Sequence, residues 1–147
     1  MKKLLGWMLI VALLFTACEG KVGPPGKDGK NIEFVVCDFV VQSENWVPVN
    51  DELMGNLFEY GFNFPQLTGY IFDEGAVVCY LVQDLGGGII QTPLPYTFYG
   101  ELDDVLYSEN YTYEISPGHI NFIVKISDFD TEVQQPLSCT FRVVLMW

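Results

Sequence analysis

Positive charge is scarce in this sequence. Seven of its 147 residues are Lys or Arg, against 19 Asp and Glu, and the formal net charge is −12. Nucleic-acid binding needs cations that neutralise phosphates, so the composition argues against a nucleic-acid partner. It also argues against docking on an anionic membrane through basic residues. Within residues 31–147 the imbalance is larger, because two cations stand against 17 acids, which gives −15.

Catalytic motifs are also lacking. The chain has one histidine, His119, which follows the turn residues Pro117 and Gly118. Nucleophilic catalysis by a His needs a partner nucleophile and an orienting acid, and no Gly-x-Ser-x-Gly motif is present. No Cys-x-x-Cys spacing indicates zinc or redox chemistry. We therefore predict a protein that is not an enzyme and has no resident cofactor, and a small hydrolase is the weakest alternative.

No hydrophobic run is long enough to span a membrane as a helix. After Met1-Lys2-Lys3, the uncharged run from Leu4 to Phe15 has about a dozen residues, whereas a spanning helix needs roughly 20. A basic start, a short apolar run and the small residues Thr16 and Ala17 are typical of a secretory signal peptide. The sequence thus predicts a signal peptide over residues 1–17, directly before Cys18.

Residues Leu14-Phe15-Thr16-Ala17-Cys18 resemble the lipobox of bacterial lipoproteins. In that family the signal is cut before the Cys, which is then acylated. Phe15 departs from the usual Leu, Val or Ile at its position. The resemblance implies lipidation of Cys18 and anchoring in a lipid bilayer, because several acyl chains hold far more firmly than one. We expect a lipid-anchored protein of the cell envelope, in the outer membrane, and the side that it faces stays open.

Glycine recurs at every third position after the lipobox. Gly20, Gly23, Gly26 and Gly29 each begin a triplet, as in the collagen G-X-Y repeat, where only Gly fits the axis of three chains. Four triplets are few, and one alone contains proline. A flexible tether over residues 18–30 is the favoured interpretation. The alternative is a short triple helix, which would make the protein a homotrimer.

The whole arrangement resembles the collagen-like lipoproteins of Bacteroidota, in which a lipobox, a short G-X-Y stretch and a small strand-rich head follow one another. The matching segments are Cys18-Glu19-Gly20, residues 23–29, residues 91–96 and residues 141–147. This resemblance covers nearly the full chain. It implies an architecture and no biochemical activity.

Period-two alternation dominates residues 31–147. The predicted core-facing sets are Val35, Cys37, Phe39 and Val41; Phe58, Tyr60, Phe62 and Phe64; Tyr111, Tyr113 and Ile115; Ile120, Phe122, Val124 and Ile126; and Leu137, Cys139, Phe141, Val143, Leu145 and Trp147. Many short strands separated by Gly, Pro, Asn and Asp indicate a single antiparallel β-sandwich, immunoglobulin-like or jelly-roll-like, over residues 31–147.

Turn residues predict how some strands connect. Asp73-Glu74-Gly75 predicts a hairpin turn between residues 70–72 and 76–82. Pro93 and Pro95 remove ladder donors, so the strand from Tyr96 to Tyr99 is expected at an edge. One short turn of helix is expected within residues 51–56.

Three cysteines remain besides Cys18: Cys37, Cys79 and Cys139. An odd number cannot be a complete disulfide framework, and three pairings are possible. Cys37 and Cys139 lie on the predicted core faces of the terminal strands, which often neighbour each other in sandwiches. The favoured interpretation is that all three are buried thiols.

Acidic residues at alternate positions form a possible calcium site at Asp128, Asp130 and Glu132. Calcium needs several oxygen ligands from one loop, although the EF-hand spacing is absent. Glu101, Asp103 and Asp104 form a second cluster. In a protein this acidic, solvated turns are the favoured interpretation of both clusters.

Aromatic residues crowd one stretch of the chain, where they form a candidate ligand-binding set. Rings serve as rigid contact surfaces at interfaces, and a row of them can stack on sugars. We therefore predict a structural or interaction module with a protein partner, and a carbohydrate-binding accessory protein as the first alternative. The candidate binding residues are Tyr96, Tyr99, Tyr107, Tyr111 and Tyr113.

Overall fold

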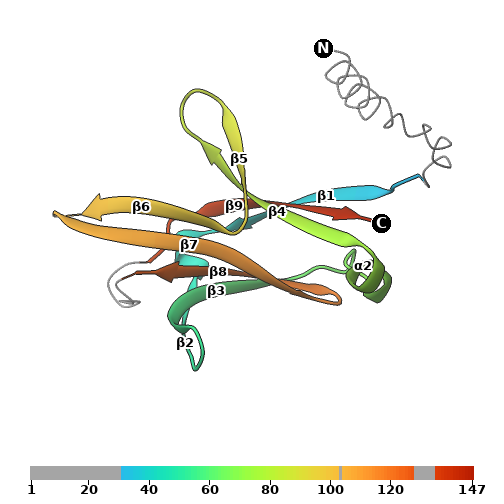
Figure 1. Ribbon diagram of the computed structural model, residues 1–147, viewed down its shortest axis with the longest axis horizontal. Coiled ribbons are helices and arrows are strands. Elements are labelled where there is room, and N and C mark those ends of the chain that lie inside the picture. The colour runs from blue at the N-terminus through green and yellow to red at the C-terminus, as the bar shows by residue number, and fades with distance from the viewer. Residues whose placement is uncertain (1–30, 103, 128–134) are drawn as a thin grey trace, which may run out of the picture. The chain divides into compact units, whose positions relative to one another are not determined.

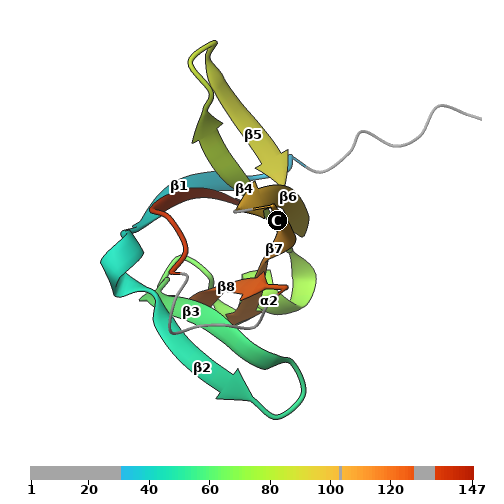
Figure 2. The ribbon, with the colours of Figure 1, turned by 90° about the vertical axis from the view of Figure 1, so that its left-hand side faces the viewer.

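Antiparallel strands in two sheets make up most of the computed structural model, which describes residues 31–102, 104–127 and 135–147. Sheet A has the order β1-β9-β4-β5 and sheet B the order β2-β3-β8-β7-β6. The two sheets form two packed layers (Figure 1, Figure 2), which confirms the predicted all-β sandwich. The strands are β1 (Phe34–Val41), β2 (Val47–Asp51), β3 (Gly55–Asn63), β4 (Ala76–Asp84), β5 (Ile89–Pro93), β6 (Tyr96–Leu102), β7 (Val105–Ser116), β8 (His119–Ile126) and β9 (Cys139–Met146).

The first and last strands are neighbours. β1 pairs antiparallel with β9 along its whole length, and β9 pairs with β4 on its other side. The alternation of β9 is confirmed, because Phe141, Val143 and Leu145 are fully buried. β9 therefore joins β1 to β4 and β5 in sheet A.

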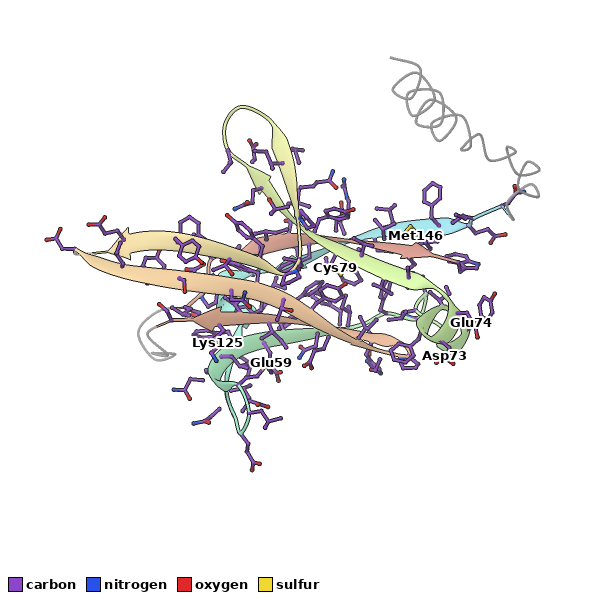
Figure 3. The ribbon with its side chains drawn as sticks, in the orientation of Figure 1. Glu59, Asp73, Glu74, Cys79, Lys125 and Met146 are labelled. Atoms are coloured by element: carbon purple, nitrogen blue, oxygen red, sulfur yellow. The ribbon has the colours of Figure 1, made fainter. Side chains whose placement is uncertain are left out.

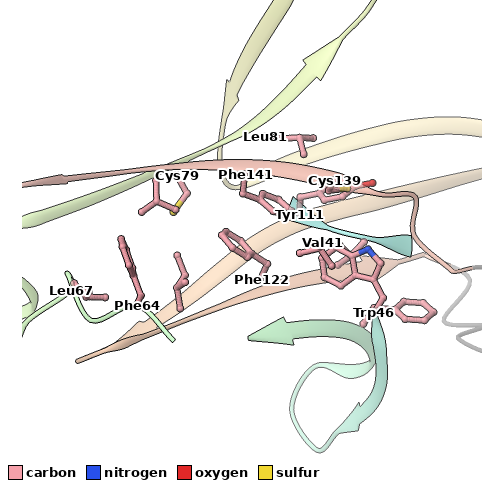
Figure 4. Packing of buried hydrophobic residues seen from close by; sticks show 14 of the residues in the cluster. Val41, Trp46, Phe64, Leu67, Cys79, Leu81, Tyr111, Phe122, Cys139 and Phe141 are labelled. Carbon is pink, nitrogen blue, oxygen red and sulfur yellow. The ribbon is translucent and has the colours of Figure 1, made fainter. Parts of the chain in front are cut away.

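Aromatic rings fill the space between the sheets (Figure 4). Phe122 of β8 stacks on Phe141 of β9 with ring centroids 4.0 Å apart and planes 9° apart. The ring centroid of Phe39 in β1 lies 5.0 Å from that of Phe62 in β3 and 5.0 Å from that of Phe64, which follows β3. These contacts explain why the alternating sets of β1, β3, β8 and β9 face inward together.

A short helix stands where the sequence predicted a hairpin turn, so that prediction is wrong. Helix α2 (Gly69–Glu74) is capped by the Thr68 hydroxyl, which accepts a hydrogen bond from the N–H of Ile71 at 3.3 Å. Ile71 is buried in the core. At the end of α2, a Cβ on Gly75 would lie 2.6 Å from the carbonyl oxygen of Met146. Gly75 therefore serves a close approach of two backbones rather than a turn.

Three smaller expectations are also corrected. Residues 51–56 form a tight turn between β2 and β3 without a helix, in which the Asp51 carboxylate accepts the N–H groups of Leu53 and Met54 at 2.8 Å. Leu137 is 78% exposed, because β9 begins only at Cys139. Ile123 alternates with the core-facing residues of β8 but is itself buried.

Proline residues mark edge strands, as expected. Pro93 ends β5 at one edge of sheet A, and Pro95 precedes β6 at one edge of sheet B. β4 and β5 form a hairpin that projects from the sandwich (Figure 1), and Ile89 at its end is 71% exposed. The predicted edge position of residues 96–99 is confirmed. The signal peptide, Cys18 and the tether lie outside the described residues.

Candidate interaction surface

The outer face of sheet A is mostly apolar, although it faces away from the core. Register brings its side chains into rows across the strands: Val36 lies opposite Val144, which lies opposite Val78. The next row toward the start of β1 is also apolar and consists of Phe34, Met146 and Ala76. We call this set the sheet A face; its apolar members are Phe34, Val36, Val40, Ala76, Val78, Tyr80, Val82, Pro93, Val144 and Met146.

Several members of the sheet A face are open to solvent. Phe34 is 67% exposed, and Val36 and Val40 are about half exposed. Figure 3 marks Met146 on this side of sheet A, whereas Cys79 lies between the sheets. Contiguous apolar patches on a monomer are uncommon and mark interaction sites. The sheet A face is therefore the candidate functional surface.

One ion pair neutralises the charge within the sheet A face. The Arg142 guanidinium of β9 donates two hydrogen bonds to the Asp38 carboxylate of β1, from Nε to Oδ1 at 2.8 Å and from Nη2 to Oδ2 at 2.7 Å. This bidentate geometry holds the pKa of Asp38 below its usual value. Because these two charges cancel, β1 and β9 add no excess charge to the face, in a domain whose formal charge is strongly negative.

A hollow of about 340 Å³ lies at one end of the sheet A face. Ala76 and Met146 belong to both the face and the hollow, and Ile32, Glu74, Gly75 and Trp147 complete its lining. Its walls are mainly apolar. The hollow thus extends the sheet A face with a depression that an apolar side chain of a partner could enter.

The outer face of sheet B is more polar, although Val47, Tyr99 and Ile123 also lie on it by register. Cross-strand hydrogen bonds join its polar side chains: the Asn121 amide donates to Glu59 at 3.0 Å, and the Asn110 amide donates to the Thr97 hydroxyl at 3.0 Å. Figure 3 marks Glu59 and Lys125 on this sheet. A polar outer face is the ordinary state of an antiparallel sheet that faces water. The contrast sets the sheet A face apart.

His119 lies on the sheet B side, in a hollow of about 460 Å³ that also includes Glu114, Ser116 and Asn121. Ser116 is opposite His119 in the ladder between β7 and β8. All of Glu114, Ser116 and His119 are exposed, and the structure shows no hydrogen bond between the side chains of His119 and Ser116.

The five candidate tyrosines do not form one exposed strip. Tyr111 is buried, with its hydroxyl donating to Glu109, and Tyr96 stacks on it at 6.4 Å. Tyr113 donates to the carbonyl of Val77 at 3.0 Å, and so bridges the two sheets. Tyr107 packs over Gly100, where a Cβ would lie 2.6 Å from its ring. Tyr99 alone of the five is largely exposed, at 79%.

The cysteines are free thiols in the structure, and no two of them are placed to pair within one chain. Cys37 and Cys79 both lie opposite Val143, on either side of β9, which puts them about 10 Å apart. Cys139 lies four residues farther along the strands, about 14 Å from each. A disulfide needs Cα atoms within roughly 7 Å. Cys79 and Cys139 are buried, and Cys37 is half-buried.

Burial makes the inner thiols very weak acids. Desolvation raises the pKa of Cys79 to about 12 and that of Cys139 to about 12. The pKa values of Tyr111 and Tyr113 are also raised, chiefly by burial. These groups therefore stay neutral at physiological pH and act as core residues rather than as nucleophiles.

The predicted calcium residues Asp128, Asp130 and Glu132 lie outside the described residues, as does Asp103 of the second acidic cluster. Among the residues that the structure describes, no group of three or more His, Cys, Asp or Glu side chains is placed to hold a metal ion. The calcium site remains a prediction.

Comparisons with known proteins add no relative. No family model, curated protein or solved structure matches this chain. In the described part of the chain, no helix is long and apolar enough to cross a membrane.

Proposed function

We propose that this protein is a lipid-anchored component of the cell envelope whose β-sandwich is a non-catalytic interaction module. In this proposal Cys18 holds the protein in the bilayer, and the sheet A face binds an apolar, uncharged surface of a protein partner. The observation that carries the proposal is the difference between the two outer faces. The sandwich presents a largely polar face on sheet B and, on sheet A, a mostly apolar face in which the charges of Asp38 and Arg142 are paired.

Charge and ring positions favour a protein partner over the alternatives. The strongly acidic domain is repelled by anionic lipids, so direct docking of the sheet A face on a membrane is disfavoured. A sugar platform needs several coplanar exposed rings, whereas Tyr111 is buried and Tyr113 is bonded between the sheets. An apolar patch with a central ion pair resembles the composition of protein interfaces, whose cores are depleted in unpaired charge.

The sheet A face can be tested by photo-crosslinking in cells that make the full chain. A benzophenone side chain at Val78, in the centre of the face, is expected to give one discrete protein adduct. The matched control places the same group at Thr112, on the outer face of sheet B, where no such adduct is expected. Mass spectrometry identifies the adduct. Equal adducts at both positions, or adducts to lipid or glycan alone at Val78, would contradict the proposed docking surface.

The lipid anchor is tested separately. The variant Cys18→Ala removes the thiol that would be acylated, and the protein is expected to move from the membrane fraction to the soluble fraction. Metabolic labelling with a fatty-acid analogue should mark the wild type and not the variant. The matched control is Cys79→Ala, which should keep both label and membrane association. A Cys18→Ala chain that still fractionates with membranes would overturn the anchor.

A further inference from the structure

β1 is an edge strand without the devices that usually protect such strands. The described sandwich has four edges, formed by β1, β5, β2 and β6. β2 contains Pro48, β5 contains Pro93, and β6 carries Glu101, whereas β1 has no proline and no lysine. Proline, charge and short length are what prevent edges from pairing with other chains. The one charge in β1, Asp38, is already neutralised by Arg142.

Hydrogen bonds at the start of β1 show which of its backbone groups are open. Glu33 and Trp147 exchange both N–H···O bonds, at 2.9 and 3.0 Å, and the register from there to Val41 is continuous. Hydrogen-bonded and non-hydrogen-bonded pairs alternate in an antiparallel ladder. The residues two, four, six and eight positions beyond Glu33 therefore bond to β9. The residues between them direct their N–H and C=O groups to the open edge: Phe34, Val36, Asp38 and Val40.

We propose that β1 pairs antiparallel with β1 of a second copy of this chain, about a two-fold axis. The two four-stranded A sheets then become one continuous sheet of eight strands. The edge is self-complementary, because a two-fold axis sets its outward-directed residues against the same residues of the other copy. The proposal is independent of the docking role of the sheet A face, since it rests on backbone groups at one edge.

Charge and overlap select one register. Hydrogen bonding between the copies requires that outward-directed residues pair with one another, so Asp38 can lie opposite Phe34, Val36, Asp38 or Val40 of the second copy. Asp38 opposite Asp38 brings like charges together, and Asp38 opposite Phe34 or Val40 shortens the overlap. With Asp38 opposite Val36, residues 34–40 of both copies pair. Cys37 then lies opposite Cys37 of the second copy, on the axis.

The tether is compatible with this arrangement. The two β1 strands begin at opposite ends of the new pairing, about 21 Å apart. Residues 18–30 enter β1 from the predicted anchor and can span up to about 40 Å when extended. Both anchors can therefore reach one bilayer. The two-fold pairing also doubles the sheet A face, because the outer faces of both sheets become continuous.

Cys37 provides a cross-linking test of both the pairing and its register. Opposed non-hydrogen-bonded residues have Cα atoms about 4.5 Å apart, within the range of a disulfide. The full chain in mild detergent is treated with diamide, whose azo bond takes up the two electrons and two protons that two thiols release. We expect a disulfide-linked dimer on a non-reducing gel. It should be lost in Cys37→Ser and retained in Cys79→Ser.

The solution mass and an edge variant complete the test. Sedimentation of the untreated chain, corrected for detergent, should give the mass of two copies. Val36→Glu places a carboxylate opposite Asp38 of the second copy at both ends of the two-fold contact, and this like-charge pairing is expected to weaken dimerisation at least tenfold without changing the thermal melt. Val47→Glu is the matched control, because Val47 is similarly exposed (52% against 48%) on the edge strand β2.

Several outcomes overturn the proposal. A mass of one copy, or of three as a triple helix would give, excludes the two-fold pairing. A dimer that survives Val36→Glu, or a cross-link that survives Cys37→Ser, places the contact elsewhere. A dimer that diamide does not link through Cys37 overturns the register and the proposal with it. Photo-crosslinking at Val78 is unaffected by these results, because Val78 lies on β4, two strands from the edge.

Discussion

Deletion of residues 141–147 is expected to abolish cooperative unfolding of the sandwich. The deletion removes most of β9, which lies between β1 and β4 in sheet A. Without β9, β1 has no neighbouring strand in sheet A. Phe39 of β1 is then no longer held against Phe62 and Phe64. Phe141, Val143 and Leu145, all fully buried, are lost together. Their combined loss is as large as the stability of about 5–15 kcal/mol that a domain of this size has.

Far-UV circular dichroism and a thermal melt of the full and shortened chains give the result. A graded comparison uses single variants of β9. Phe141→Ala, which empties the site that stacks on Phe122, should lower the free energy of unfolding by about 3–5 kcal/mol. Thr140→Ala, on the outer face, should change it by less than about 0.5 kcal/mol. A shortened chain that still melts in one sharp transition would show that β9 is dispensable.

Alkaline solution is expected to destabilise the protein strongly. In the folded state burial raises the pKa of Cys79 and of Cys139 to about 12, while a thiol in the unfolded chain ionises near pH 9. Between these values the unfolded state releases protons that the folded state keeps. Stability is therefore fully present below pH 9 and is lost as the pH rises towards 12. Each thiol contributes a fall of about 1.4 kcal/mol per pH unit.

From pH 9 to pH 11 the two thiols together should lower the free energy of unfolding by about 5 kcal/mol. Urea unfolding at a series of pH values under reducing conditions measures this change. The double variant Cys79→Ala/Cys139→Ala should lose most of the decline, and the buried Tyr111 accounts for what remains, because its pKa is also raised. Cys37→Ala, at the half-buried edge position, serves as the control. If the double variant declines as steeply as the wild type, burial of these thiols is not the cause.

Local pattern predicted the core faces of the strands well and the short helix badly. Alternation in β1, β8 and β9 needs no more than the period of two and the apolar residues that obey it. Helix α2 has six residues, which is too short for a 3.6 period to emerge. Its single buried residue, Ile71, is equally compatible with a strand. Acidic residues before Gly75 therefore suggested a turn, whereas the glycine is needed beside the carbonyl of Met146.

The candidate surface was hidden from the sequence for a different reason. Val36 and Val144 belong to the less apolar set of their strands, and a single valine on the outer face of a sheet, such as either of these or Val78, is ordinary. The three valines form a surface only because β9 brings them into one row. For the tyrosines the sequence suggested more than the structure shows, because their closeness in sequence suggested one exposed strip. Alternation along β7 turns Tyr111 and Tyr113 towards the core instead.

The sequence by itself determined the fold class, the inward faces of most strands, the acidity of the domain and the edge positions marked by proline. These properties are local, because each depends on a residue and its neighbours within one strand. The tertiary structure decided the strand order, and with it the apolar face of sheet A, the open edge of β1 and the separation of the three thiols. Strand order joins segments as distant as residues 34–41 and 139–146. It follows from how whole sheets bury their apolar faces together, which no single segment encodes.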